Sequence, residues 1–137
     1  MDYISNLNWV HIAVCTLIYF AIGSIWYSPV LFSKIWMAQI GNLDQEKGKK
    51  QMPMLFANAF ICGGIASFGI ALLISMLGIT SMGAAIKLAL VCGGCFGFTS
   101  LSMSYMFGQR SITLLLIDSL YHIVSLVVVA IVFSVWH

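Results

Sequence analysis

Four long apolar runs constrain what this chain can fold into more than any other feature of it. Each run is about as long as the roughly 20 residues that a helix needs to cross the hydrocarbon core of a bilayer. The runs are continuous rather than alternating between apolar and polar residues, which favours helices over the strands of a transmembrane barrel. We therefore predict four membrane-spanning helices, over about residues 7–27, 54–77, 84–107 and 112–136.

The composition is that of a membrane protein and argues against a soluble domain or a nucleic-acid-binding protein. Of the 137 residues, 61% are hydrophobic and 7% are charged, whereas soluble domains carry roughly 25% charged residues. The net charge of +2 is small, and the basic residues are not interleaved with aromatic ones, so we expect no binding of nucleic acid. The sequence predicts an all-α integral membrane protein in which residues 1–137 form a single four-helix transmembrane domain.

Most of the basic residues fall in two of the connections between the runs. Arg110 lies between the third and fourth runs, Lys87 lies near the opposite side, and four lysines lie between the first and second runs, namely Lys34, Lys47, Lys49 and Lys50. Cytoplasmic loops carry an excess of Lys and Arg. We therefore expect segments 28–53 and 108–111 to be cytoplasmic and both termini to lie outside.

The segment after the first run predicts an elbow at the inner membrane surface. Ser28 suits the N-cap of a helix and Pro29 its first position, so we expect a short interfacial helix over about residues 29–40. Its apolar residues cluster on one face, which is typical of a helix lying flat on a leaflet. We expect the polar segment 42–51 to form a solvated hinge. The predicted elbow and interface residues are Trp26, Tyr27, Ser28, Pro29 and Trp36.

Small residues and cysteines mark the two middle runs. Cys62-Gly63-Gly64 and Cys92-Gly93-Gly94 predict close helix packing, because small residues let helices approach one another in lipid. Cys92 and Cys95 have the spacing of a dithiol motif. All the cysteines fall inside predicted spans, however, where a thiol behaves as a small hydrophobe. We expect no metal site and no cofactor.

Charge inside the fourth run points to a polar site in the membrane. Asp118 and His122 lie four residues apart in an otherwise apolar stretch, so on a helix they share a face. A lone carboxylate in a bilayer costs at least about 2.5 to 3.5 kcal/mol, so Asp118 needs a partner, a proton or a function. Counting residues from the cytoplasmic ends puts Asp118 in one layer with Ser24, Asn58 and Ser102, and His122 one turn deeper, near the midplane.

Two stretches give the chain a resemblance to a known family. Trp26-Tyr27-Ser28-Pro29, with Leu31-Phe32 and Trp36 after it, and Leu116-Ile117-Asp118-Ser119-Leu120-Tyr121-His122 resemble the bacterial membrane-protein family catalogued as domain of unknown function 1761. The resemblance implies a four-helix protein of the bacterial inner membrane with no established activity. The residues that it carries over have no assigned roles: Trp26, Tyr27, Asp118, Tyr121 and His122.

Two functional hypotheses follow from these residues. In the first, the chain is a structural or accessory protein rather than an enzyme, and its polar site fixes helix packing or binds lipid or a membrane partner. In the second, Asp118 and His122 serve a channel or a proton- or cation-coupled carrier that moves an ion or small solute. Four helices leave little room for a pathway in one chain, so a homo-oligomer is expected. Shared metal ligation by His11 and His122 is disfavoured, because they lie at different depths.

Overall fold

A computed structural model describes residues 3–28, 31, 34–35, 38 and 45–136 of the chain. Its helices are α1 (Trp9–Trp26), α3 (Gln45–Leu77), α4 (Met82–Leu90), the π-helix η1 (Val91–Phe98), α5 (Thr99–Phe107) and α6 (Ile112–Val135). Of these, α4, η1 and α5 follow one another without a break. The described residues contain four helical stretches long and apolar enough to cross a membrane, which confirms that the four apolar runs form helices of membrane-spanning length: Trp9–Trp26, Pro53–Leu77, Met82–Phe107 and Ile112–Val135.

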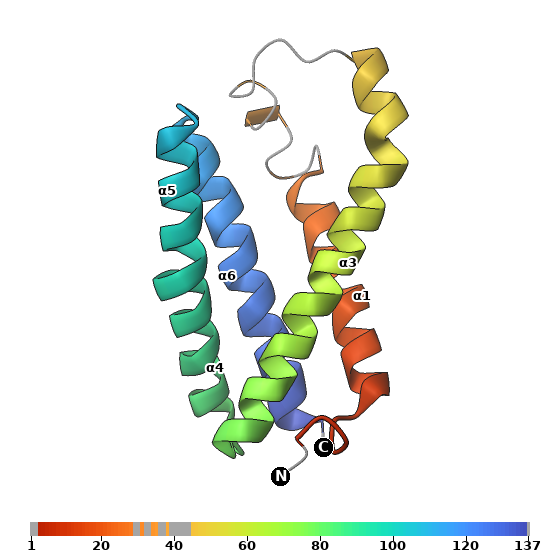
Figure 1. Cartoon of the computed structure of the whole chain (residues 1–137), viewed down its shortest axis with the longest axis vertical. Helices are drawn as coiled ribbons and strands as arrows, with labels where there is room; N and C mark the ends of the chain where they lie inside the picture. The colour runs from red at the N-terminus through yellow and green to blue at the C-terminus, as the bar shows by residue number, and fades with distance from the viewer. Residues whose placement is uncertain (1–2, 29–30, 32–33, 36–37, 39–44, 137) are drawn as a thin grey trace.

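The four long helices run alternately up and down (Figure 1). The start of α1 and the end of α6 lie at the same end of the molecule, where the ring of His11 stacks on Trp136 with 3.9 Å between the ring centroids. The turn between α5 and α6 lies at the opposite end, as does the end of α1. The end of α1 and the turn at 108–111 are therefore on one side, with the start of α1 and the end of α6 on the other.

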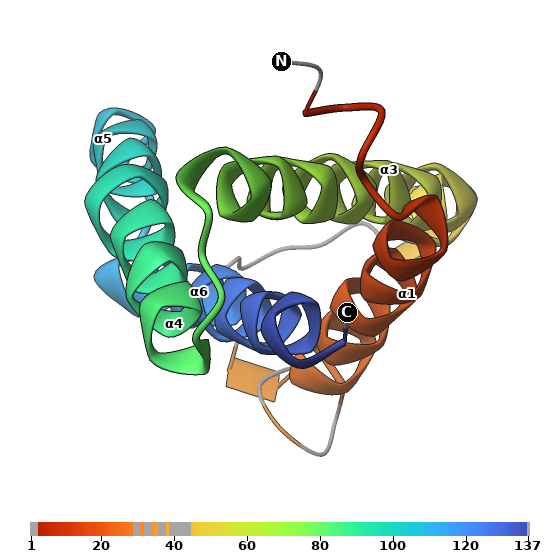
Figure 2. The ribbon, with the colours of Figure 1, turned by 90° about the horizontal axis from the view of Figure 1, so that it is seen from below.

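Helix α6 is the centre of the bundle. Viewed along the helices, it lies between α1 on one side and α4 on the other, and α3 lies against α1 (Figure 2). Its buried residues include Ser119, Ser125, Ala130 and Ser134, which are small enough for neighbouring helices to approach closely in lipid. Helix α6 thus contacts every other long helix, and its buried polar residues face protein.

Glycines set two of the closest approaches to α6 and α1. A side chain at Gly93 would begin 2.9 Å from Cγ1 and 3.2 Å from Cα of Ile123, so η1 can pack on α6 only without one. Gly63 lies against Tyr19, where an added Cβ would be 3.4 Å from the Tyr19 side chain, in ordinary van der Waals contact. The two Cys-Gly-Gly triplets therefore contribute a packing glycine each, in line with the packing that their composition predicts.

The structure corrects one prediction and leaves another outside its described part. Helix α3 begins at Gln45, so the solvated hinge predicted for 42–51 is wrong from residue 45 on. Gln, Glu and Lys are good helix formers and extend the span as a helix beyond the apolar run. Pro29 and Trp36, with most of the interfacial helix predicted for 29–40, lie outside the described residues.

Candidate functional site

Asp118 is held by two tyrosines from two other helical segments. The residue is 9% exposed. Its Oδ1 accepts a hydrogen bond of 2.5 Å from the hydroxyl of Tyr27, directly after α1, and its Oδ2 accepts one from the hydroxyl of Tyr105 in α5. The two phenols thus supply a donor to each oxygen of the carboxyl group. The cluster ties the end of α1, α5 and α6 together.

The neighbours of the two tyrosines hold them in place. The indole Nε1 of Trp26 donates to the carbonyl of Ile117 over 3.1 Å, which fixes the end of α1 against α6 beside Asp118. The guanidinium of Arg110 lies 5.3 Å from the centre of the Tyr105 ring, which is a cation–π contact. Tyr27 and Tyr105 are therefore both positioned to donate to Asp118.

His122 has a different partner, one turn further along α6. The hydroxyl of Tyr19 in α1 lies 2.8 Å from Nδ1 of His122, and the hydroxyl of Tyr121 donates to the backbone carbonyl of Tyr19 over 3.4 Å. The rings of Tyr19 and Tyr121 meet edge to face with 5.6 Å between their centroids. Gly23 makes room for this arrangement, since an added Cβ would lie 2.8 Å from the Tyr121 hydroxyl.

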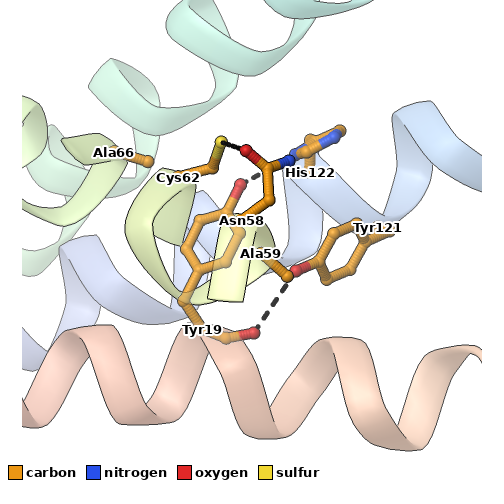
Figure 3. Close-up of a pocket in the computed structure, with 7 residues that line it drawn as sticks. All are labelled: Tyr19, Asn58, Ala59, Cys62, Ala66, Tyr121 and His122. Carbon is orange, nitrogen blue, oxygen red and sulfur yellow. Dashed lines mark hydrogen bonds between the residues drawn. The ribbon is translucent and has the colours of Figure 1, made fainter. Parts of the chain in front are cut away.

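A hollow of about 390 Å³ opens beside His122, between α3 and α6. We call it the α3–α6 hollow. Figure 3 shows that Tyr19 comes from α1 on one side of it, that Asn58 and Cys62 come from α3, and that Tyr121 and His122 come from α6. The thiol of Cys62 donates to Oδ1 of Asn58 over 3.8 Å. The complete lining is Tyr19, Asn58, Ala59, Cys62, Ala66, Tyr121 and His122.

The structure distributes the sequence-derived site residues over three places. Asp118 with Tyr27 and Trp26 forms one cluster, and His122 with Tyr121 and Asn58 lines the hollow. The serines lie apart from both. The Ser24 hydroxyl donates to Phe20 in its own helix, the Ser28 hydroxyl donates to Ile25 at the end of α1, and Ser102 is half-buried in α5.

Two tyrosines that the sequence did not indicate as partners bond to Asp118 and His122: Tyr105 and Tyr19. The depth count pointed to Asn58 and serines as partners of Asp118, but the partners in the structure are phenols, including Tyr105, which that reasoning did not consider. Tyr105 lies at the same depth from the cytoplasmic end of its run as the serines do, so a count that included long side chains would have found it. Tyr19, one turn from Cys15 in α1, similarly proves to be the partner of His122.

The chemistry of both places is hydrogen bonding. The described residues contain no group of three or more His, Cys, Asp or Glu placed to hold a metal ion. The four cysteines are free thiols: Cys15 is buried, Cys92 is half-buried, and Cys62 and Cys95 are exposed. The hollow holds the Cys62 thiol and the His122 imidazole in one lining, and among the described residues these two groups bond to Asn58 and Tyr19 and not to each other.

Fold and site together define a small all-helical protein with four helices of membrane-spanning length and a tyrosine-bound carboxylate among them. The model of a family described as "Protein of unknown function (DUF1761)" matches residues 10–134, and the chain belongs to that family. The match confirms the family that the Trp26–Pro29 and Leu116–His122 stretches indicated. No curated protein and no solved structure matches the chain.

Proposed function

We propose that this protein is a structural or accessory component of a membrane rather than an enzyme, and that its Asp118 cluster fixes how its helices pack. The observation that carries the proposal is the pair of phenol donors on one carboxyl group, Tyr27 after α1 and Tyr105 in α5. A polar cluster of this kind exists only when all three segments are assembled. It therefore favours one arrangement of the helices over its alternatives.

The energetic argument follows from the surroundings. In lipid no water replaces a lost donor, so a carboxyl group without partners costs at least about 2.5 to 3.5 kcal/mol. Hydrogen bonds between membrane helices contribute about 0.6 kcal/mol on average and up to about 1.7 kcal/mol. Two bonds at the upper end of that range offset most of the cost. The cluster then contributes less to stability than to specificity, because any packing that separates Asp118 from its phenols carries the full cost.

A channel or proton-coupled carrier receives less support from the same contacts. Both oxygens of Asp118 already accept a hydrogen bond from a phenol, and Asp118 does not line the α3–α6 hollow. Asp118 and His122 bond to different tyrosines and not to each other. A carrier would need one of these bonds to break in each cycle.

Flux and stability measurements separate the two functions. Proteoliposomes that contain the purified protein should show no more proton, cation or small-solute flux than empty vesicles, and Asp118→Asn should lower the free energy of unfolding instead. The Ser24→Ala variant is the matched control, because its hydroxyl bonds only within its own helix. A protein-dependent flux that Asp118→Asn abolishes without loss of stability contradicts the packing role.

The proposal includes a location and a topology. The family resemblance and the basic residues together support the inner membrane of a bacterium, with 28–53 and 108–111 cytoplasmic and both ends outside. In a background without native cysteines, a membrane-impermeant maleimide added to intact spheroplasts should label Thr80→Cys and leave Gln109→Cys unlabelled until the cells are opened. The reverse pattern would invert the topology.

The proposal also includes self-association. A homo-oligomer is expected from the small number of helices, which leave little room for a pathway within one chain. Chemical cross-linking in native membranes, followed by a mass measurement of the purified species in mild detergent, tests it. A monomer under both conditions removes this part of the proposal and leaves the packing role of Asp118 untouched.

A further inference from the structure

The α3–α6 hollow combines polar groups that lack partners with a position far from water. His122 lies ten residues after the start of α6 and thirteen before its end, which is about 15 Å and 20 Å along the helix axis. It therefore lies near the middle of a hydrocarbon core that is about 30 Å thick. A ligand at this depth arrives through the membrane and not from solution.

The hydrogen bond to Tyr19 determines which nitrogen of His122 carries the proton. We assign the Tyr19 hydroxyl as the donor to Nδ1, because it has no other acceptor among the described residues. In a neutral imidazole whose Nδ1 accepts, Nε2 carries the hydrogen. Nε2 has no partner among the described residues. In a membrane, an unsatisfied donor of this kind costs several kcal/mol, which an acceptor on a ligand would remove.

Asn58 adds a second donor to the same lining. Its Oδ1 accepts from Cys62, whereas its amide nitrogen has no acceptor within the described part of the chain. Asn58 lies in the portion of α3 over residues 53–62, where every residue is exposed. In Figure 1, this portion leans away from α5 and α6. The amide therefore sits at an opening of the hollow toward lipid.

The rest of the lining limits the ligand to a neutral molecule with a flat, apolar body. No charged residue lines the hollow, which excludes ions and charged headgroups as favoured occupants. Tyr19 and Tyr121 supply aromatic faces and edges, and Ala59 and Ala66 leave space next to them. A volume of about 390 Å³ is within the range of small-molecule sites.

We propose that the α3–α6 hollow binds the carbonyl-bearing ring of a membrane-dissolved quinone, with Nε2–H of His122 and the amide of Asn58 as donors to its carbonyl oxygens. A quinone is neutral, flat, soluble in the hydrocarbon core and equipped with acceptors only. The ester carbonyls of phospholipids are also acceptors, but they lie at the interface and not at the depth of His122. The inference goes beyond the packing role of Asp118, because neither Tyr27 nor Tyr105 lines the hollow.

Direct binding to the whole protein tests this proposal. Wild-type protein in nanodiscs is titrated with a radiolabelled short-chain benzoquinone, and binding to empty nanodiscs is subtracted as partition into lipid. We expect saturable binding that His122→Phe weakens about tenfold, because the ring shape is kept and the donor is lost. Wild-type binding that does not saturate, or that His122→Phe leaves unchanged, overturns the proposal.

A second pair of variants tests the site without removing a hydrogen bond. Ala59→Leu fills the hollow and should abolish saturable binding, whereas Ala57→Leu, on the opposite face of the same exposed helical portion, should leave it unchanged. Both residues are exposed, so neither change burdens the interior of the bundle. If both variants bind the quinone as the wild type does, the hollow is not the site. If mass spectrometry finds a phospholipid that Ala59→Leu alone releases, the occupant is a lipid and the quinone assignment is overturned.

Discussion

Removing the two phenol hydroxyls from Asp118 singly and together tests the packing role most directly. Tyr27→Phe and Tyr105→Phe each delete one oxygen and keep the ring, so that the edge-to-face contact of Tyr27 with Tyr121, at 5.4 Å between centroids, is retained. After either single change the other phenol still donates to the carboxyl group. Each single change should therefore lower the free energy of unfolding by only about 1 kcal/mol.

The double variant should lose more free energy of unfolding than the two single variants lose together. Without both phenols, Asp118 has no donor among the described residues, and the cost approaches the roughly 3 kcal/mol of a bare carboxyl group in a bilayer. The excess over additivity should be about 1 kcal/mol, since both donors share one acceptor group.

Reversible unfolding in mixed micelles, followed by circular dichroism against the mole fraction of denaturing detergent, measures all four species of the cycle. Ser24→Ala is the control, and its effect should be close to zero because its hydroxyl is exposed and bonds only to Phe20. If the two single changes cost less than about 0.3 kcal/mol each, or if the double variant is additive, the shared-carboxylate argument is refuted.

Three further predictions concern packing and the turn between α5 and α6. Gly93→Ala should lower the free energy of unfolding by about 1 to 3 kcal/mol, because the added Cβ would meet the Ile123 backbone. Gly94→Ala is the control: an added Cβ there would have nothing within 4 Å, so this change should be neutral or stabilising in the same unfolding assay. Gly23→Ala should displace the Tyr121 ring. The near-ultraviolet circular dichroism of this variant should therefore change, while its helix content should stay that of the wild type. Gln109, at φ 56°, should tolerate Gly with a gain of up to about 1 kcal/mol, and a loss of stability would contradict the strain argument.

Much of the fold is a consequence of the sequence, because four long apolar runs leave few choices of secondary structure. An apolar run of about 20 residues that enters lipid must satisfy its backbone internally, so four helices of membrane-spanning length follow from the lengths of the runs. The starts of α1, α4 and α6 follow as well, since Asn8, Ser81 and Ser111 accept hydrogen bonds from the first turns of their helices. The start of α3 at Gln45 does not, because apolarity marks where the membrane is and not where a helix begins.

Only the tertiary structure decided the partners of the polar residues. The sequence established that Asp118 must be satisfied, and that it shares a face with His122. It did not establish which helix faces them, because lipid tails are as apolar as the side chains and no hydrophobic gradient orients one span toward another. That choice depends on contacts between helices far apart in the chain: Gly23 against Tyr121, Gly93 against Ile123, and Trp26 on the Ile117 carbonyl. These contacts bring Tyr27 and Tyr105 to Asp118 and Tyr19 to His122, and leave the hollow between α3 and α6 beside them.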